Sequence, residues 1–93
     1  MSERAFAPLV ASPLLIPHVR NPGGKGGRRI TAGTVDGEWA LEVDGSVTEY
    51  GSPLALVHAF NAALRDAQRV GLTSRPEPVP LTLDALRGAG ADV

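Results

Sequence analysis

Residues 36–45 read DGEWALEVDG, a run of alternating polar and apolar side chains enclosed by two Asp-Gly pairs. Asp-Gly pairs close two-residue hairpin turns, because both central residues of such turns need a positive φ. The enclosed run therefore predicts a strand that pairs with a strand on each side. We expect a three-stranded antiparallel β-meander made of Arg29–Val35, Glu38–Val43 and Ser46–Tyr50.

The two turns also predict the register of this meander. A two-residue turn places Val35 opposite Glu38 and Val43 opposite Ser46, and opposed residues share one face of a sheet. One face is then largely apolar and the other is acidic, which we interpret as a buried face and a solvated face. The apolar face is expected to hold Ile30, Ala32, Thr34, Trp39, Leu41, Val43, Ser46, Thr48 and Tyr50, and the acidic face Thr31, Gly33, Val35, Glu38, Ala40, Glu42, Val47 and Glu49.

A helix is expected directly after the third strand. Ser52 is a favourable N-cap, Pro53 suits the first helical position, and Gly71 is a typical residue just past a helix end. Between them, apolar residues recur at spacings of three and four, which is typical of an amphipathic helix. These residues are Leu56, Val57, Phe60, Ala63, Leu64 and Ala67. We predict an α+β fold in which this helix covers the Trp39 face, a β-β-β-α unit.

Three zones of different composition divide the chain. Residues 1–27 form a proline- and glycine-rich arm that we expect to be extended, either adding a strand to the sheet edge or lying over a partner. Residues 28–71 form the β-β-β-α core. Residues 72–93 begin as a proline-rich spacer, after which Thr82 is expected to cap a short helical turn over Leu83–Arg87.

Composition narrows the classes of function. The chain has 93 residues, a formal net charge of −1 and no cysteine, so thiolate metal sites, disulfides and a cysteine nucleophile are excluded. We find no apolar stretch near the length of a membrane span and expect a cytoplasmic protein. Arginine strongly outnumbers lysine, and alanine, glycine and valine are abundant, a usage typical of GC-rich bacterial or phage genomes.

No catalytic motif is present, and we expect no enzyme, no cofactor and no metal. The two histidines, His18 and His58, are isolated and form neither a metal signature nor a catalytic triad. The stretch Asn21–Arg29 is rich in glycine but fails the phosphate-loop pattern, because Gly26 stands where serine or threonine must follow the lysine.

The apolar arms favour a small non-enzymatic interaction or assembly protein, for example a phage virion component or a phage protein that binds a host factor. A core of residues 28–71 is near the lower size limit for an independent domain, yet many apolar residues lie outside it. They either wrap their own domain or bind a second copy or another protein, and we expect a homo-oligomer. The candidate partner-binding residues are Phe6, Leu9, Leu14, Leu15 and Ile16.

The alternative is a nucleic-acid-binding regulator. Its phosphate contacts would come from the basic segment before the first strand and from two helix arginines, namely Lys25, Arg28, Arg29, Arg65 and Arg69. The glutamates of the acidic sheet face would repel phosphate, which favours the protein-interaction hypothesis.

Overall fold

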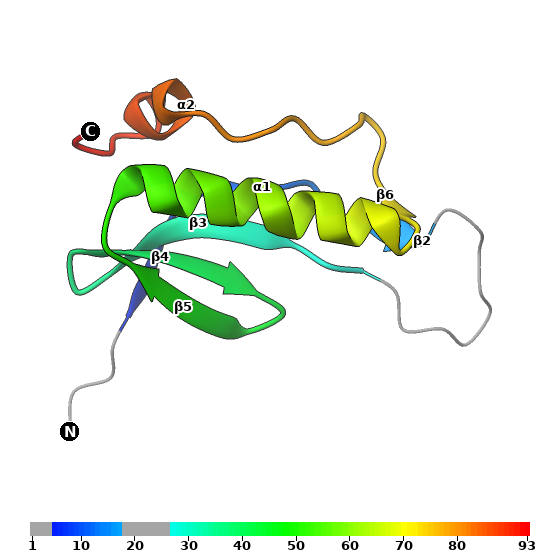
Figure 1. Cartoon of the computed structure of the whole chain (residues 1–93), viewed down its shortest axis with the longest axis horizontal. Helices are drawn as coiled ribbons and strands as arrows, with labels where there is room; N and C mark the ends of the chain where they lie inside the picture. Colours follow the sequence, from blue (N-terminus) through cyan, green and yellow to red (C-terminus); the bar gives the residue numbers. More distant parts are fainter. Residues whose placement is uncertain (1–4, 18–26) are drawn as a thin grey trace.

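The computed structural model describes residues 5–17 and 27–93 and has an α+β fold with one main helix (Figure 1). An antiparallel sheet of four strands has the order β1-β3-β4-β5, and a separate pair joins β2 to β6. The elements are β1 (Phe6–Ala11), β2 (Ile16–Pro17), β3 (Ile30–Val35), β4 (Glu38–Val43), β5 (Ser46–Tyr50), α1 (Pro53–Arg69), β6 (Leu72–Thr73) and α2 (Leu83–Gly88).

Both Asp-Gly turns have the backbone conformation that the sequence predicts. Asp36 and Gly37 have φ of 51° and 81°, and Asp44 and Gly45 have φ of 53° and 84°. Positive φ at both central residues matches the right-handed twist of the flanking strands. Val35 accordingly pairs with Glu38 and Val43 with Ser46, so the predicted register of the meander is confirmed.

The sheet has four strands where three were expected, because part of the N-terminal arm adds a strand to the sheet edge, one of the two alternatives that the sequence left open for it. Phe6–Ala11 pairs antiparallel with β3 along the edge that the meander leaves open. The register shifts between Pro8 and Val10, a bulge that accommodates a proline without a backbone donor. Where β1 ends, Ser12 continues the pairing: its N–H donates to the Ile30 carbonyl oxygen at 2.7 Å, and its Oγ accepts from the Ile30 N–H at 3.0 Å.

The main helix begins and ends as its sequence signals predict. The Ser52 side chain accepts a hydrogen bond from the Ala55 N–H at 3.1 Å, and Pro53 is the first helical residue. At the other end Val70 is the C-cap and Gly71 has a φ of 92°. The buried side of α1 packs on the face of the sheet that carries Ile30 and Leu41, and it consists of Leu56, Val57, Phe60, Leu64 and Ala67.

The C-terminal segment packs on the same layer as α1 (Figure 1). Thr82 caps α2 by accepting from the Ala85 N–H, and Leu81 and Leu86 are buried in the common core. Asn61 on α1 fastens this segment twice: its Nδ2 donates to the Leu81 carbonyl oxygen at 3.0 Å, and its Oδ1 accepts from the Leu81 N–H at 2.7 Å. A side-chain amide thus replaces a strand partner for Leu81.

Among residues 5–17 and 27–93, no helix covers the other face of the sheet (Figure 1). This outer face carries the three strand glutamates, but it is not uniformly solvated as the sequence suggests. Phe6 lies across it next to Gly33, and Val35 and Ala40 are buried there. The arm therefore supplies an aromatic cover for the centre of the face, and the acidic side chains surround it.

Replacing Gly33 with alanine should detach β1 from the sheet. A Cβ at Gly33 would collide with the Ala7 carbonyl oxygen and lie 2.9 Å from Phe6 Cζ. We expect Gly33→Ala to lower the free energy of unfolding by about 1–3 kcal/mol, the usual cost of overpacking. Urea denaturation of Gly33→Ala beside Gly51→Ala measures this, since a Cβ at Gly51 meets nothing within 4 Å. Equal stability of the two variants would contradict the close approach of β1.

Candidate protein-interaction surface

Three consecutive apolar residues after β1 have different environments. Leu15 is fully buried in the core, and its backbone pairs with Arg28 through two hydrogen bonds of 2.8 Å, one in each direction. This pairing fixes the backbone on both sides of Leu15. The side chains of Leu14 and Ile16 consequently point outward and remain 48% and 49% exposed.

Leu14 and Ile16 line one surface hollow of about 530 Å³. We call it the β2–β6 hollow, because its walls come from the segment around β2 and from the segment that contains β6. Its lining residues are Pro13, Leu14, Ile16, Pro17, Thr73, Ser74 and Arg75. The pairs Ile16–Thr73 and Pro17–Leu72 hold the two walls together at the C-terminal end of α1 (Figure 1).

The other predicted partner-binding residues face their own domain. Leu15 is buried, so it anchors the hollow and does not line it. Leu9 is half-buried and packs against the core, and Phe6 is half-buried on the outer face of the sheet. The structure therefore brings two of the five residues, Leu14 and Ile16, together as an exposed apolar pair.

Sequence reasoning missed the second wall of the hollow. Thr73, Ser74 and Arg75 follow Gly71 directly, and no periodicity marks them as a strand because β6 has two residues. The Ser74 hydroxyl donates to the Pro76 carbonyl oxygen at 2.8 Å, which fixes the turn into the spacer. The one available signal was the apolar and β-branched pair Leu72-Thr73 just after the helix end.

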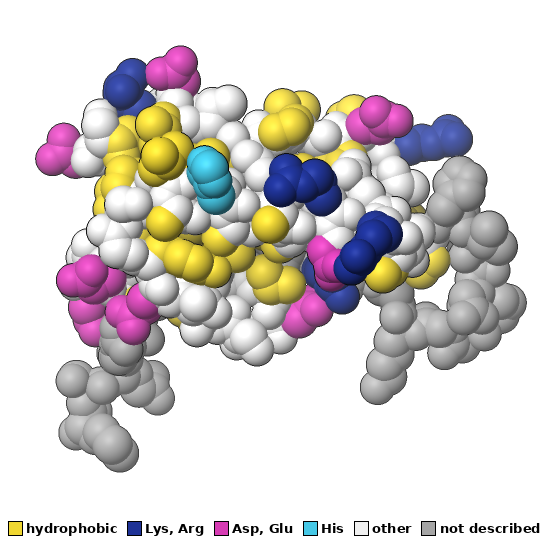
Figure 2. Space-filling model, viewed as in Figure 1, with side chains coloured by type: hydrophobic (Ala, Val, Ile, Leu, Met, Phe, Trp, Pro, Cys, Tyr) yellow, Lys and Arg dark blue, Asp and Glu magenta, His cyan; other side chains and the backbone are white. Residues whose placement is uncertain are grey.

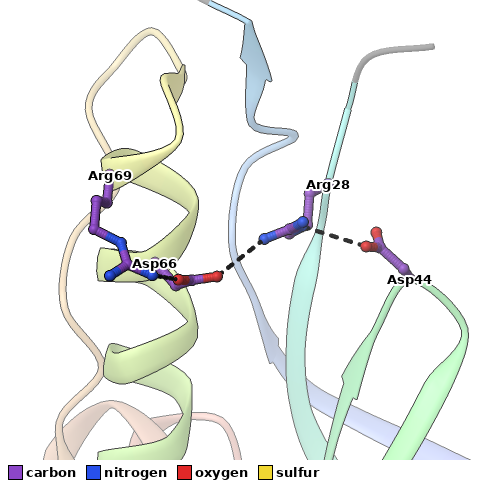
Figure 3. A network of polar contacts seen from close by, with 4 residues as sticks. All are labelled: Arg28, Asp44, Asp66 and Arg69. Carbon is purple, nitrogen blue, oxygen red and sulfur yellow. Dashed lines mark hydrogen bonds and ion pairs between the residues drawn. The ribbon is translucent and has the colours of Figure 1, made fainter.

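Two of the predicted phosphate-binding arginines form ion pairs with carboxylates (Figure 3). Arg28 Nε lies 3.3 Å from Asp44 Oδ2, and Arg28 Nη1 lies 3.8 Å from Asp66 Oδ2. Arg69 pairs with the same Asp66, one turn away on α1. These ion pairs form an intramolecular network that joins the segment before β3, the β4–β5 turn and α1, and its four side chains have no net charge as a group.

The remaining cations of the nucleic-acid hypothesis do not join this network. Arg65 is exposed on α1 and lines a shallow depression with Asp66 and Arg69. Arg29 stands between Arg28 and Ile30, which both face α1, so strand alternation turns Arg29 toward the opposite face. Lys25 lies outside the described residues.

The described part of the chain offers no arrangement for metal or nucleophilic chemistry. Residues 5–17 and 27–93 contain no group of three His, Cys, Asp or Glu side chains that could hold a metal ion. His58 is exposed on α1, whereas His18 lies outside the described residues. No helix in the described ranges has the length and apolar character needed to cross a membrane.

No protein-family model, curated protein or solved structure matches this chain.

The two arginines of the network should contribute unequally to stability. Arg28 is 29% exposed and bridges two elements, whereas Arg69 is 79% exposed and pairs within its own helix. We expect Arg28→Ala to lower the free energy of unfolding by about 1 kcal/mol and Arg69→Ala by only about 0.3 kcal/mol. Urea denaturation at low and high salt measures both, and the Arg28 effect should shrink with salt. A larger loss in Arg69→Ala would contradict this assignment.

Proposed function

We propose that this protein is a small, non-enzymatic interaction or assembly protein that binds itself or another protein through the β2–β6 hollow. The observation that carries the proposal is the pair Leu14 and Ile16, two aliphatic side chains about half exposed in one hollow. Leu15 between them is fully buried, whereas Leu14 and Ile16 keep about half of their surface exposed, which supports a contact with a partner.

The backbone around the hollow is fixed before any partner binds, which supports this role. Leu15 is hydrogen-bonded to Arg28 on both of its backbone groups, and Pro13 and Pro17 restrict φ on either side. Side chains held in place lose little conformational freedom on binding, so more of the burial energy remains as affinity. An apolar pair presented in this way suits an aliphatic or aromatic side chain of a partner protein.

Polar residues border the apolar pair on one side of the hollow, which favours one orientation of a bound partner. Thr73, Ser74 and Arg75 stand beside the apolar pair, and Arg75 is exposed. Interfaces commonly combine an apolar centre with a polar rim in which arginine is enriched. A second copy of the chain is the first partner to test, because the acidic outer face of one copy offers carboxylates to Arg75 of another.

Self-association should depend on the hollow. We expect the wild-type protein to form a dimer or larger species as its concentration rises. The double variant Leu14→Ser/Ile16→Ser removes apolar contact area, so it should need a protein concentration about ten-fold higher or more to reach the same degree of assembly. Sedimentation velocity measures the assembly. Val79→Ser is the matched control, since Val79 is 78% exposed and lies in the proline-rich segment outside the hollow. Equal assembly of the double variant and the wild type would refute self-association through this surface.

Duplex DNA binding tests the alternative hypothesis. Because Arg28 and Arg69 are matched by Asp44 and Asp66, we expect no measurable binding to a labelled DNA duplex even at low ionic strength. Fluorescence anisotropy measures this over a salt series. Tight binding that weakens steeply with salt, and that Arg29→Ala or Arg65→Ala reduces, would favour the nucleic-acid regulator instead.

A further inference from the structure

The segment between β6 and α2 is fastened to the domain at both of its ends. At its start the Ser74 hydroxyl donates to the Pro76 carbonyl oxygen at 2.8 Å. At its end Leu81 is buried and exchanges two hydrogen bonds with Asn61 of α1. Figure 1 shows the segment running along α1 from β6 to α2. The residues between the two anchor points are thus held in place from both sides.

Alternating prolines restrict the backbone between these anchor points. Pro76, Pro78 and Pro80 each fix φ at roughly −65°. Glu77 and Val79 each precede a proline, and such residues are kept out of the helical region and in the β or polyproline II region. All five residues are therefore restricted in a way that favours a polyproline II helix. We call residues 76–80 the proline segment.

Exposure along the proline segment follows the three-residue period of a polyproline II helix. Pro78 is half-buried, and Leu81, three residues later, is 4% exposed, so this side rests on the domain. The remaining positions are exposed and form two ridges, which are Pro76 with Val79 and Glu77 with Pro80. Val79 is 78% exposed, so nearly its whole side chain faces solvent.

The polar groups of this segment are unused within residues 5–17 and 27–93. The backbone N–H groups of Glu77 and Val79 and the carbonyl oxygens of residues 77–80 form no hydrogen bond there. The Glu77 carboxylate forms no ion pair there. Figure 2 shows hydrophobic side chains at the upper rim of the molecule, over the stretch between β6 and α2. Apolar ridges and free carbonyl oxygens therefore lie together on an exposed surface.

We propose that the proline segment docks into a groove of another protein that is lined by aromatic side chains. Such grooves recognise polyproline II segments because the shape of the segment is formed before binding. The ridge of Pro76 and Val79 would lie between aromatic rings, and the free carbonyl oxygens would accept hydrogen bonds from groups such as a tryptophan N–H. A basic side chain at the edge of the groove would pair with Glu77.

The fixed ends of the segment support this role. An extended peptide loses conformational freedom when it binds, whereas this segment is already restricted by its prolines and by its anchors at Ser74 and Leu81. Less of the contact energy is then spent on ordering the chain, so a short segment gains useful affinity.

A second copy of the chain is a poor occupant of this surface. The chain has four aromatic residues, and all of them are buried or half-buried, namely Phe6, Trp39, Tyr50 and Phe60. No aromatic groove is therefore offered by the described residues. The surface is also separate from the β2–β6 hollow, whose lining residues end at Arg75.

A panel of purified aromatic-groove domains tests the proposal on the full chain. The probes are isolated SH3 and WW domains, two classes that bind polyproline II segments in aromatic-lined grooves. We expect at least one probe to shift the amide NMR signals of Glu77 and Val79 and to leave those of β4 unchanged. The affinity of that probe should fall as salt rises, because Glu77 pairs with a basic side chain.

Variants of Val79 separate polyproline recognition from the addition of a strand. Val79→Asp places a charge on the apolar ridge and should weaken binding about ten-fold or more. Val79→Pro removes an N–H that an added strand would need, but it keeps the polyproline II geometry and should bind within about two-fold of the wild type. Leu54→Ser is the matched control, because Leu54 is 53% exposed on α1 outside the segment. Thermal unfolding by circular dichroism checks that each variant is folded.

Three outcomes would overturn the proposal. They are failure of every probe domain to bind, unchanged binding by Val79→Asp, and signal shifts that lie away from the proline segment. Loss of binding in Val79→Pro would also overturn it, in favour of strand addition. Sedimentation velocity keeps the two surfaces apart: Val79→Asp should self-associate as the wild type does, and Leu14→Ser/Ile16→Ser should bind the probe normally.

Discussion

Positive φ at the four residues of the two Asp-Gly turns is the constraint on which the other contacts depend. Each turn fixes the register of two strands, and register decides which side chains face α1. A slip of one residue in β4 would turn Trp39 and Leu41 to the acidic face and remove both from the apolar layer on which α1 packs. The packing of β1 depends on the same register, because Gly33 must face the side of the sheet on which Phe6 of β1 lies.

The elements that sequence analysis predicted are those specified by neighbouring residues. The turns, the meander and α1 with its Ser52 cap each have a signal within a few positions. β1 and the β2–β6 pair join segments far apart in the chain, so the sequence left an added edge strand as one of two alternatives for the arm and did not predict the β2–β6 pair. The one local trace of β1 is Gly33, whose missing side chain leaves room for Phe6. Asn61 gave no signal, because its role depends on Leu81, twenty residues away.

The candidate surface was predicted in part for the same reason. Composition marks Leu14, Leu15 and Ile16 alike, and only the pairing of Leu15 with Arg28 decides which of them is buried. Arg28 shows the converse: it looks available in the sequence, but folding brings Asp44 and Asp66 to it, whereas Arg69 pairs with Asp66 one turn away on the same helix. Long-range pairing, which a single sequence does not reveal, thus separates exposed groups from those that the fold satisfies.

The hold of Asn61 on Leu81 links the two ends of the chain. This one amide fastens the segment that leads to α2, and α2 in turn packs on β1 as well as α1. If the two hydrogen bonds between Asn61 and Leu81 break, α2 is held less firmly against α1. β1 then loses the element that packs against it. The first and last parts of the described chain are therefore expected to unravel as one cooperative unit, while the central hairpins stay folded against α1.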